Sequence, residues 1–436
     1  MPSTVLETAR AAAAAPPVHE PRELSYLRIV AQGLVPATAA ATPVEAVRRQ
    51  LAIQGQQVSA IPHAILARTP RSVTRADVDA AAFEESALVR SWPMRGTVHV
   101  TTAEDHHWMR EALVHRLSGW MKVDEERFGH GSAGLARAAA AARAALTAAA
   151  GEGRPGLTRA ELFEVWEADG ILPELIASGM PETYAKRHLV VALHATGHLV
   201  QGPRRGNEHL IVSAEELPPA SSGPGGAAGT AHGTEGHRAA VAEIARRYAT
   251  SHGPISAADL SRWTTLPATE CRRALEDAVE LTNAADYAVD AEHSHAPLTR
   301  YRAEGGLRGT VTVLGAGTEA APRGRAGTDV LYGRADLPDL LESSRRAAES
   351  TLYLGAFDEL HVGYKDRLSL TDAAGELLIC PSMNGMFRPL LVDHGRVVAV
   401  RPARSEPVWA ADARVSSRLE KDVERVVSRM ERRLAR

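Results

Sequence analysis

The hydrophobic and polar positions along the chain repeat one plan three times, and each copy places closely joined short helices before a β-hairpin. The helical segments carry apolar residues at helical spacing, and the hairpin segments alternate between apolar and polar residues. Short helices followed by a hairpin are the elements of a winged helix-turn-helix. The pattern therefore predicts an α+β fold with three such units in tandem.

The first copy begins after residue 41. Thr42 suits an N-cap, Pro43 suits the first helical position, and Glu45 suits the far side of a capping box. This helix should end near Ala52, because Gly55 interrupts the pattern before two further short helices. The segments "ALVRSW" and "GTVHVTT", joined by "PMR", then predict a hairpin.

The second and third copies resemble each other in their first helices. "GLTRAELFEVW" begins with a capping box at Thr158–Glu161, and "PISAADLSRW" begins with one at Ser256–Asp259. Each segment ends on a tryptophan, Trp166 or Trp263. This parallel is the main internal evidence that the plan is repeated.

The composition shifts along the chain predict its division into segments. Gly, Ser and Pro dominate the stretch between the second and third copies, which cannot bury a core and should be flexible. We expect a disordered tail at 1–21, winged-helix units at 22–130 and 131–214, a flexible linker at 215–236, a third unit with a Gly-rich loop at 237–345, and a β-rich part with a basic terminal helix at 346–436.

The last segment combines predicted strands with one long helix. Strands are expected in "TLYLGAFDEL", "GELLIC" and "FRPLLVDHGRVVAVRP", the last with "DHG" as its turn. The final helix should bury one stripe of apolar residues, namely Val415, Leu419, Val423, Val426, Met430 and Leu434. Arginines fill its other faces, where a solvated, ion-paired surface is favoured over contact with DNA.

Charge and cysteine content limit the class of protein. The formal net charge of −3 gives no global attraction to nucleic acid, although a local basic face is compatible with it. Cys271 and Cys380 form no metal or redox motif, so a reduced, cytoplasmic setting is expected. No export signal or membrane-spanning run is recognisable, and His99, His106 and His107 have no zinc-type spacing.

The stretch "LAIQGQQVSAIPHAILAR" places Gln54 and Gln56 on either side of Gly55. An amide cannot titrate, and it is not a preferred metal ligand. On these residues alone a solvated turn is the favoured interpretation, with a catalytic role as the alternative.

A family resemblance changes that balance. Together with "ALVRSWPMRGTVHVTTAEDHHW", "LGAFDELHVGYKDR" and "FRPLLVDHGRVVAVRPAR", this stretch resembles the winged-helix DNA glycosylases typified by AlkZ and YcaQ, over roughly residues 24–410. The resemblance implies tandem winged units around a DNA-binding channel. It also implies a catalytic motif of glutamine, an aliphatic residue and glutamine or aspartate, which aligns Gln54 and Gln56 with the catalytic positions and sets Gly55 in the aliphatic one.

The resemblance implies a monofunctional DNA glycosylase that releases cationic N7- or N3-alkylated purines, and some relatives also unhook interstrand crosslinks. Such a base is already a good leaving group, so two amides that orient a water and the sugar-phosphate are sufficient, without a metal or cofactor. Asp358 is a candidate stabiliser of the cationic sugar, although a helix cap or ion pair is the favoured role for it.

The expected partner is double-stranded DNA, alkylated or crosslinked, in the nucleoid of the cytoplasm, with no membrane and no obligate protein partner. The candidate DNA contacts are arginines on predicted wings, helices and loops: Arg90, Arg95, Arg204, Arg205, Arg272, Arg273, Arg388, Arg401 and Arg404. The alternative function is a non-catalytic winged-helix DNA-binding protein or transcriptional regulator, because repeated winged units suit both.

Overall fold

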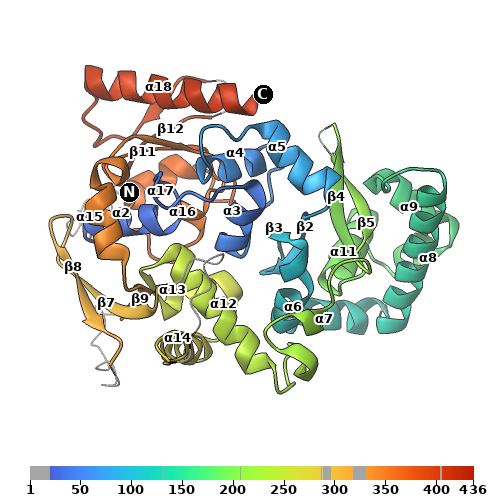
Figure 1. The fold of residues 1–436 in the computed structure, drawn as a ribbon. Coiled ribbons are helices and arrows are strands. Elements are labelled where there is room, and N and C mark those ends of the chain that lie inside the picture. Colours follow the sequence, from blue (N-terminus) through green and yellow to red (C-terminus); the bar gives the residue numbers. More distant parts are fainter. Residues whose placement is uncertain are drawn as a thin grey trace, which may run out of the picture.

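The computed structural model describes residues 20–436 except for positions 130, 207, 286, 288–295, 318–329 and 403–404. The expected disordered tail, apart from its last two residues, and part of the Gly-rich loop lie outside the described residues. Helices and strands alternate along the chain in a mixed α+β fold, as the sequence predicts (Figure 1). No helix of the described residues has both the length and the apolar character that a membrane crossing demands.

The first two hairpins form one continuous sheet, a relationship that the sequence did not predict. Its strand order is β1-β3-β2-β4-β5, from β1 (Ile53–Gln54), β2 (Leu88–Met94), β3 (Thr97–Thr102), β4 (Leu199–Arg205) and β5 (Glu208–Ser213). The two hairpins meet where Arg90 of β2 lies opposite Gln201 of β4. The short strand β1 adds Gln54 to the sheet opposite His99 of β3.

Short helices precede each of these hairpins. Before β2 come α3 (Pro43–Gln50), α4 (Ala60–Ala67), α5 (Arg75–Asp79) and a π-helical turn, η1 (Ala80–Glu84). Between the hairpins lie α6 (Ala103–Val114), α7 (Ser118–Phe128), α8 (Ser132–Gly151), α9 (Arg159–Ala168), α10 (Ile171–Ala177) and α11 (Glu182–Ala195). In Figure 1 helices α8 and α9 lie to the right of β4 and β5, and α11 packs against β2 and β4.

The predicted helix starts are largely confirmed. Thr158 and Ser256 each cap a helix and complete a capping box with the residue three positions on. At Thr42 the side chain accepts a hydrogen bond from the N–H of Glu45, but the Glu45 carboxylate accepts from the N–H of Ala41. The capping box predicted there is therefore wrong in one bond: the Glu45 carboxylate accepts from Ala41, one residue before the N-cap Thr42.

The third group of helices packs against the first hairpin region. It comprises α12 (His237–His252), α13 (Ala257–Thr264) and α14 (Ala268–Thr282), with a sheet of order β6-β9-β7-β8 built from β6 (Ile255–Ser256), β7 (Leu298–Glu304), β8 (Thr310–Gly315) and β9 (Leu331–Arg334). One buried cluster joins Met94 and Trp108 to Tyr248 and Trp263. Trp166 is equally buried, in a separate core of the second group.

The C-terminal segment contains a four-stranded sheet, but not every strand lies where the sequence predicts it. Its sheet has the order β10-β11-β12-β13, from β10 (Leu352–Leu354), β11 (Leu390–Asp393), β12 (Arg396–Val400) and β13 (Val408–Trp409). The strand expected at "GELLIC" is wrong: these residues fall in helix α17 (Ala373–Ile379), because Asp372 caps that helix by accepting from the N–H of Gly375. "FDEL" likewise leads into a short helix, α16 (Glu359–Val362).

Two further helices complete this segment. Helix α2 (Arg22–Ala31) packs on α15 (Leu337–Ala348), and α18 (Ser417–Leu434) lies across β10 and α4 (Figure 1). The buried stripe of α18 consists of Leu419, Val423, Val427 and Met430. Val415, expected in that stripe, precedes the helix and is exposed.

The segment expected as a flexible linker is packed against the protein. It forms two short 3₁₀ turns, η2 (Ala220–Ser222) and η3 (Gly226–Ala228), and η2 contacts α6. A Cβ at Gly223 would lie 2.4 Å from the Cβ of Trp108, so the glycine permits a close approach to that ring. Thr230 is fully buried. Small residues allow either close packing or conformational flexibility, and the composition of this segment does not show which of the two applies.

Candidate functional site

The backbone of the Gln54-Gly55-Gln56 stretch is held in place by its neighbours. Gly55 donates from its N–H to the carbonyl of Val98 at 2.8 Å, and its own carbonyl accepts from Nε of Arg90 at 2.8 Å. A Cβ at Gly55 would lie 3.1 Å from the carbonyl carbon of His99, so the position is crowded by β3. This glycine therefore packs closely on the sheet and does not loosen the loop.

The two glutamine side chains differ in exposure. Gln54 is partly buried, and its Oε1 is fully shielded and accepts no hydrogen bond from the described residues. Gln56 is exposed. A buried carbonyl oxygen without a donor calls for a water or a ligand group, so Gln54 can orient such a group while Gln56 reaches outward from the same loop.

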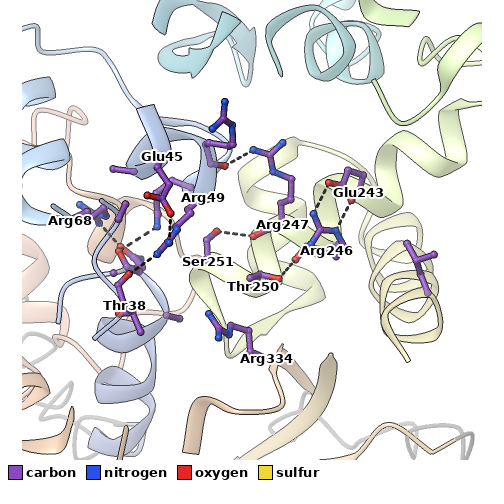
Figure 2. Close-up of a pocket in the computed structure, with 18 of the residues that line it drawn as sticks. Thr38, Glu45, Arg49, Arg68, Glu243, Arg246, Arg247, Thr250, Ser251 and Arg334 are labelled. Atoms are coloured by element: carbon purple, nitrogen blue, oxygen red, sulfur yellow. Dashed lines mark hydrogen bonds and ion pairs between the residues drawn. The ribbon is translucent and has the colours of Figure 1, made fainter. Parts of the chain in front are cut away.

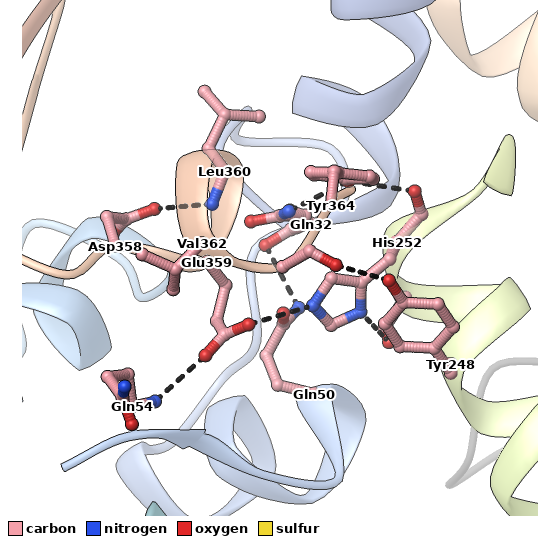
Figure 3. A network of polar contacts seen from close by, with 12 residues as sticks. Gln32, Gln50, Gln54, Tyr248, His252, Asp358, Glu359, Leu360, Val362 and Tyr364 are labelled. Carbon is pink, nitrogen blue, oxygen red and sulfur yellow. Dashed lines mark hydrogen bonds and ion pairs between the residues drawn. The ribbon is translucent and has the colours of Figure 1, made fainter. Parts of the chain in front are cut away.

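Glu359 is the carboxylate that contacts this loop (Figure 3). Its Oε1 accepts from the backbone N–H of Gln54 at 2.9 Å, and its Oε2 lies 3.5 Å from Nε2 of His252. Burial alone would raise the pKa of the Glu359 carboxyl, but the contact with His252 and the charge of Arg95 lower that pKa below its ordinary value. Glu359 therefore brings a buried negative charge to Gln54.

Arg95 and His99 face this carboxylate from the first hairpin. Nη2 of Arg95 donates to Nε2 of His99 at 2.9 Å, and Nδ1 of His99 donates to the carbonyl of Thr97 at 2.9 Å. Burial, reinforced by Arg95, lowers the pKa of His99 to about 3, so its imidazole is neutral and accepts from the arginine. We call Gln54, Gln56, Arg95, His99 and Glu359 the glutamine site.

A second layer of polar contacts supports the glutamine site. Tyr364 donates from its hydroxyl to the carbonyl of His252 at 2.8 Å and accepts from Nε2 of Gln32 at 2.9 Å. The hydroxyl of Tyr248 donates to the carbonyl of Gly363, and its ring stacks on His252 with centroids 4.5 Å apart. These contacts tie α12 to α16, and they fix the imidazole that meets Glu359.

Asp358 forms the helix cap and ion pair that the sequence favoured, and its candidate role as a sugar stabiliser stays a prediction. Both of its carboxylate oxygens accept from Arg68, each at 2.9 Å, and Oδ1 also accepts from the N–H of Leu360. It is 1% exposed and caps α16. Its lone pairs are thus occupied by a buried ion pair, whereas the next residue, Glu359, turns to Gln54. Sequence reasoning missed Glu359, although the adjacent acids of "FDEL" were a visible signal.

The candidate DNA-contacting arginines within the described residues lie on several different elements. Arg90 is 7% exposed and bonds Gly55 and Gln201, so it positions the loop; burial lowers its pKa to about 10. Arg95 belongs to the glutamine site. The others lie on separate elements: Arg204 and Arg205 at the end of β4, exposed Arg272 and Arg273 on α14, Arg388 before β11 and Arg401 after β12, while Arg404 is outside the described residues.

A pocket of about 370 Å³ lies between α3 and α12, next to the second layer (Figure 2). Gln32, Gln50 and Arg68 line it, but neither catalytic candidate does. Its other arginines are paired with acids, through the pairs Arg48–Glu104, Arg49–Glu45, Arg246–Glu243, Arg247–Asp105 and Arg334–Asp336. Between the two helices, Arg247 of α12 donates to the carbonyl of Arg48 in α3.

Comparison with known proteins places this geometry in a family. The fold is similar to that of Streptomyces sahachiroi DNA glycosylase AlkZ, with a TM-score of 0.63 and 18% sequence identity over 94% of this chain and 96% of that one. No match was found among curated protein sequences. The family model described as DNA glycosylase AlkZ-like matches residues 47–307, more than half of the chain and including Gln54 and Gln56. The chain therefore belongs to the AlkZ-like family of DNA glycosylases.

Proposed function

We propose that this DNA glycosylase hydrolyses the N-glycosidic bond of cationic N7- or N3-alkylated purines in double-stranded DNA, with Gln54 and Gln56 as its catalytic residues. The observation that carries the proposal is that the buried Oε1 of Gln54 accepts no hydrogen bond from the described residues and lies on the same loop as the exposed Gln56. In this proposal Gln54 accepts a hydrogen bond from the attacking water, and Gln56 donates to a sugar or phosphate oxygen.

The charges of the glutamine site suit such a substrate. The alkylated base leaves as a neutral purine and takes its bonding electrons with it, so no proton donor is needed. Positive charge develops on the sugar, as in other glycoside hydrolyses. Glu359, held ionised, contributes a negative charge behind Gln54, and it offers no proton to a neutral base. Normal bases would be spared because the site cannot activate them.

The proposed scaffold is three winged helix-turn-helix units around a DNA-binding channel. Helices α3 to α5 with β2 and β3, helices α9 to α11 with β4 and β5, and helices α13 and α14 with β7 and β8 follow the same order of elements. The proposed boundaries are 22–130, 131–214 and 237–345. Exposed Arg205 and partly buried Arg204 on a wing, and exposed Arg272 and Arg273 on a helix, are the proposed phosphate contacts in this arrangement.

Crosslinks are a further proposed substrate. A crosslinked base cannot rotate freely out of the duplex, and the exposed position of Gln56 is compatible with attack on a base that is not fully flipped.

A pair of matched lesions tests the substrate class. One duplex carries N7-methylguanine, which is cationic, and the other carries 7-methyl-7-deazaguanine, which has the same shape and no charge. We expect release of the first base and none of the second, measured as alkali-labile abasic sites. Release of neither base, or equal release of both, would contradict the proposal.

A further inference from the structure

Three histidines outside the glutamine site converge on one point. They are His115 at the end of α6, His232 in the segment between the second and third units, and His237 at the start of α12. One ring nitrogen from each lies within 4.8 Å of the others. The rings of His115 and His232 stack with centroids 4.3 Å apart, and His237 meets both edge-on.

The orientation of His237 points to a bound cation. Its Nδ1 lies 3.0 Å from the carbonyl of Thr230, which can only accept, so Nδ1 carries the proton. Its Nε2 has no hydrogen bond within the described part of the chain and lies 3.5 Å from Oε1 of Glu270. A neutral imidazole in this position would direct its Nε2 lone pair at the carboxylate, and a bound cation between them would make that arrangement favourable. His237 is 8% exposed, so water screens this repulsion poorly.

We propose that His115, His232, His237 and Glu270 bind a Zn²⁺ ion that fastens the 215–236 segment to α6, α12 and α14. Three imidazoles and a carboxylate form a ligand set that suits tetrahedral zinc, and His232 and His237 have the spacing of two zinc ligands near each other in sequence. The Nδ1 bond from His237 to a backbone carbonyl is the usual support of a ligating imidazole.

The geometry requires only a small closure. Ligands about 2.0–2.1 Å from a tetrahedral ion lie roughly 3.4 Å apart, so nitrogens now within 4.8 Å of one another must approach by up to about 1.4 Å. His232 is exposed on a loop with glycines on both sides, at 229 and 233, and can make this movement. Glu270, in the first turn of α14, is already next to His237.

The site would stiffen two elements that lead to the glutamine site. Helix α6 begins directly after β3, which carries His99, and α12 ends at His252, which meets Glu359. The start of α12 contacts α6 (Figure 1). The proposal does not depend on the proposed substrate, because the three histidines and Glu270 take no part in the reaction described above.

The test is metal binding by the full-length protein, produced without a histidine tag and stripped with a chelator. Zinc content after dialysis against ZnCl₂ should be one ion per chain, and Co²⁺ in its place should give the visible absorption of a tetrahedral complex. His232→Ala removes a proposed ligand on an exposed loop and should weaken zinc binding by about 100-fold or more. This is more than the loss expected when a residue that only hydrogen-bonds to a ligand is replaced. Glu270→Gln should weaken it less.

His394→Asn is the matched control, because His394 lies in the β11–β12 turn with a φ of 45°, a conformation that asparagine accepts. It should bind zinc as the wild type does. Zinc should also raise the Tm of the wild type and protect residues 215–236 from proteolysis, and it should do neither for His232→Ala. No zinc on the wild type at micromolar free metal, or equal binding by His232→Ala, would overturn the proposal.

Discussion

The carboxylate of Glu359 accepts a hydrogen bond from the backbone N–H of Gln54 at 2.9 Å, although 305 positions separate the two residues. This bond joins the C-terminal segment to the Gln54-Gly55-Gln56 loop, and Glu359 is buried while Gln54 is partly buried. The loop is held from its other side by Arg90, which bonds the Gly55 carbonyl. The glutamine site is therefore assembled from residues distant in sequence, and these bonds hold the backbone of its loop.

Removing the charge of Glu359 while keeping its shape should slow excision. In Glu359→Gln an amide oxygen can still accept from Gln54, but the negative charge behind the cationic sugar is lost. We expect the excision rate of N7-methylguanine under single-turnover conditions to fall by roughly tenfold or more, from the electrostatic term alone, with little change in DNA affinity.

Glu424→Gln, on the exposed face of α18, is the control for this substitution and should leave the rate unchanged. An unaltered rate in Glu359→Gln would show that its charge does not act on the reaction.

Arg90 should act by holding the loop and not by binding phosphate. Arg90→Met removes the donors to the Gly55 carbonyl and to Oε1 of Gln201, and it leaves these acceptors buried. We expect a loss of about 1–3 kcal/mol in the free energy of unfolding for each buried acceptor left unpaired, together with slower excision. Binding of undamaged DNA should keep its salt dependence, because no phosphate contact is lost.

Salt titrations of DNA affinity for Arg90→Met and Arg205→Ala separate the two roles. Arg205 is exposed at the end of β4, so its replacement should lower the slope of log affinity against log salt by about one. A lowered slope in Arg90→Met would contradict its assignment as a positioning residue.

The buried pair of Asp358 and Arg68 should matter for stability. Asp358→Ala leaves a guanidinium that is 2% exposed without its partner, which should cost about 3–5 kcal/mol in the free energy of unfolding. Replacing both residues by apolar ones, in Arg68→Met with Asp358→Leu, should recover much of that loss. The measurement is urea unfolding, with excision normalised to the folded fraction. If Asp358→Ala folds but has no activity, the assignment of Asp358 to a purely structural role is contradicted, and a role in stabilising the cationic sugar is favoured.

Stability should fall as the pH drops below about 6.5, before carboxylates begin to protonate. Burial lowers the pKa of both His99 and His194 to about 3, whereas in the unfolded chain these imidazoles titrate near 6.5. The unfolded state therefore binds more protons between these values, and each histidine should cost roughly 1 kcal/mol per pH unit below 6.5. Urea midpoints at pH 7.5, 6.5 and 5.5 measure the effect, and equal midpoints would contradict it.

Most helices and strands could be predicted from the sequence, because the patterns that specify them involve residues close together in the chain. Capping boxes at Thr158 and Ser256 and the alternation in "GTVHVTT" depend on neighbours a few positions apart. The shared sheet of the first two hairpins, and the helix at "GELLIC", depend on tertiary pairing and on one cap. The same limit applies to the site. The glutamines could be recognised as a motif, but the hydrogen bond from Gln54 to Glu359 spans 305 positions. No local sequence pattern shows that Glu359, and not Asp358, makes this contact.

The most direct test of the account is single-turnover release of N7-methylguanine by the wild type, Gln54→Ala, Gln56→Ala and Gln57→Ala. Gln57 is the matched control, because it is exposed on the same loop and donates only to the Ser59 hydroxyl among the described residues. The account predicts that Gln54→Ala and Gln56→Ala each lose about 10²-fold or more in rate, as for an oriented dipole at a reacting centre, while Gln57→Ala matches the wild type. Equal rates in all four proteins would contradict it.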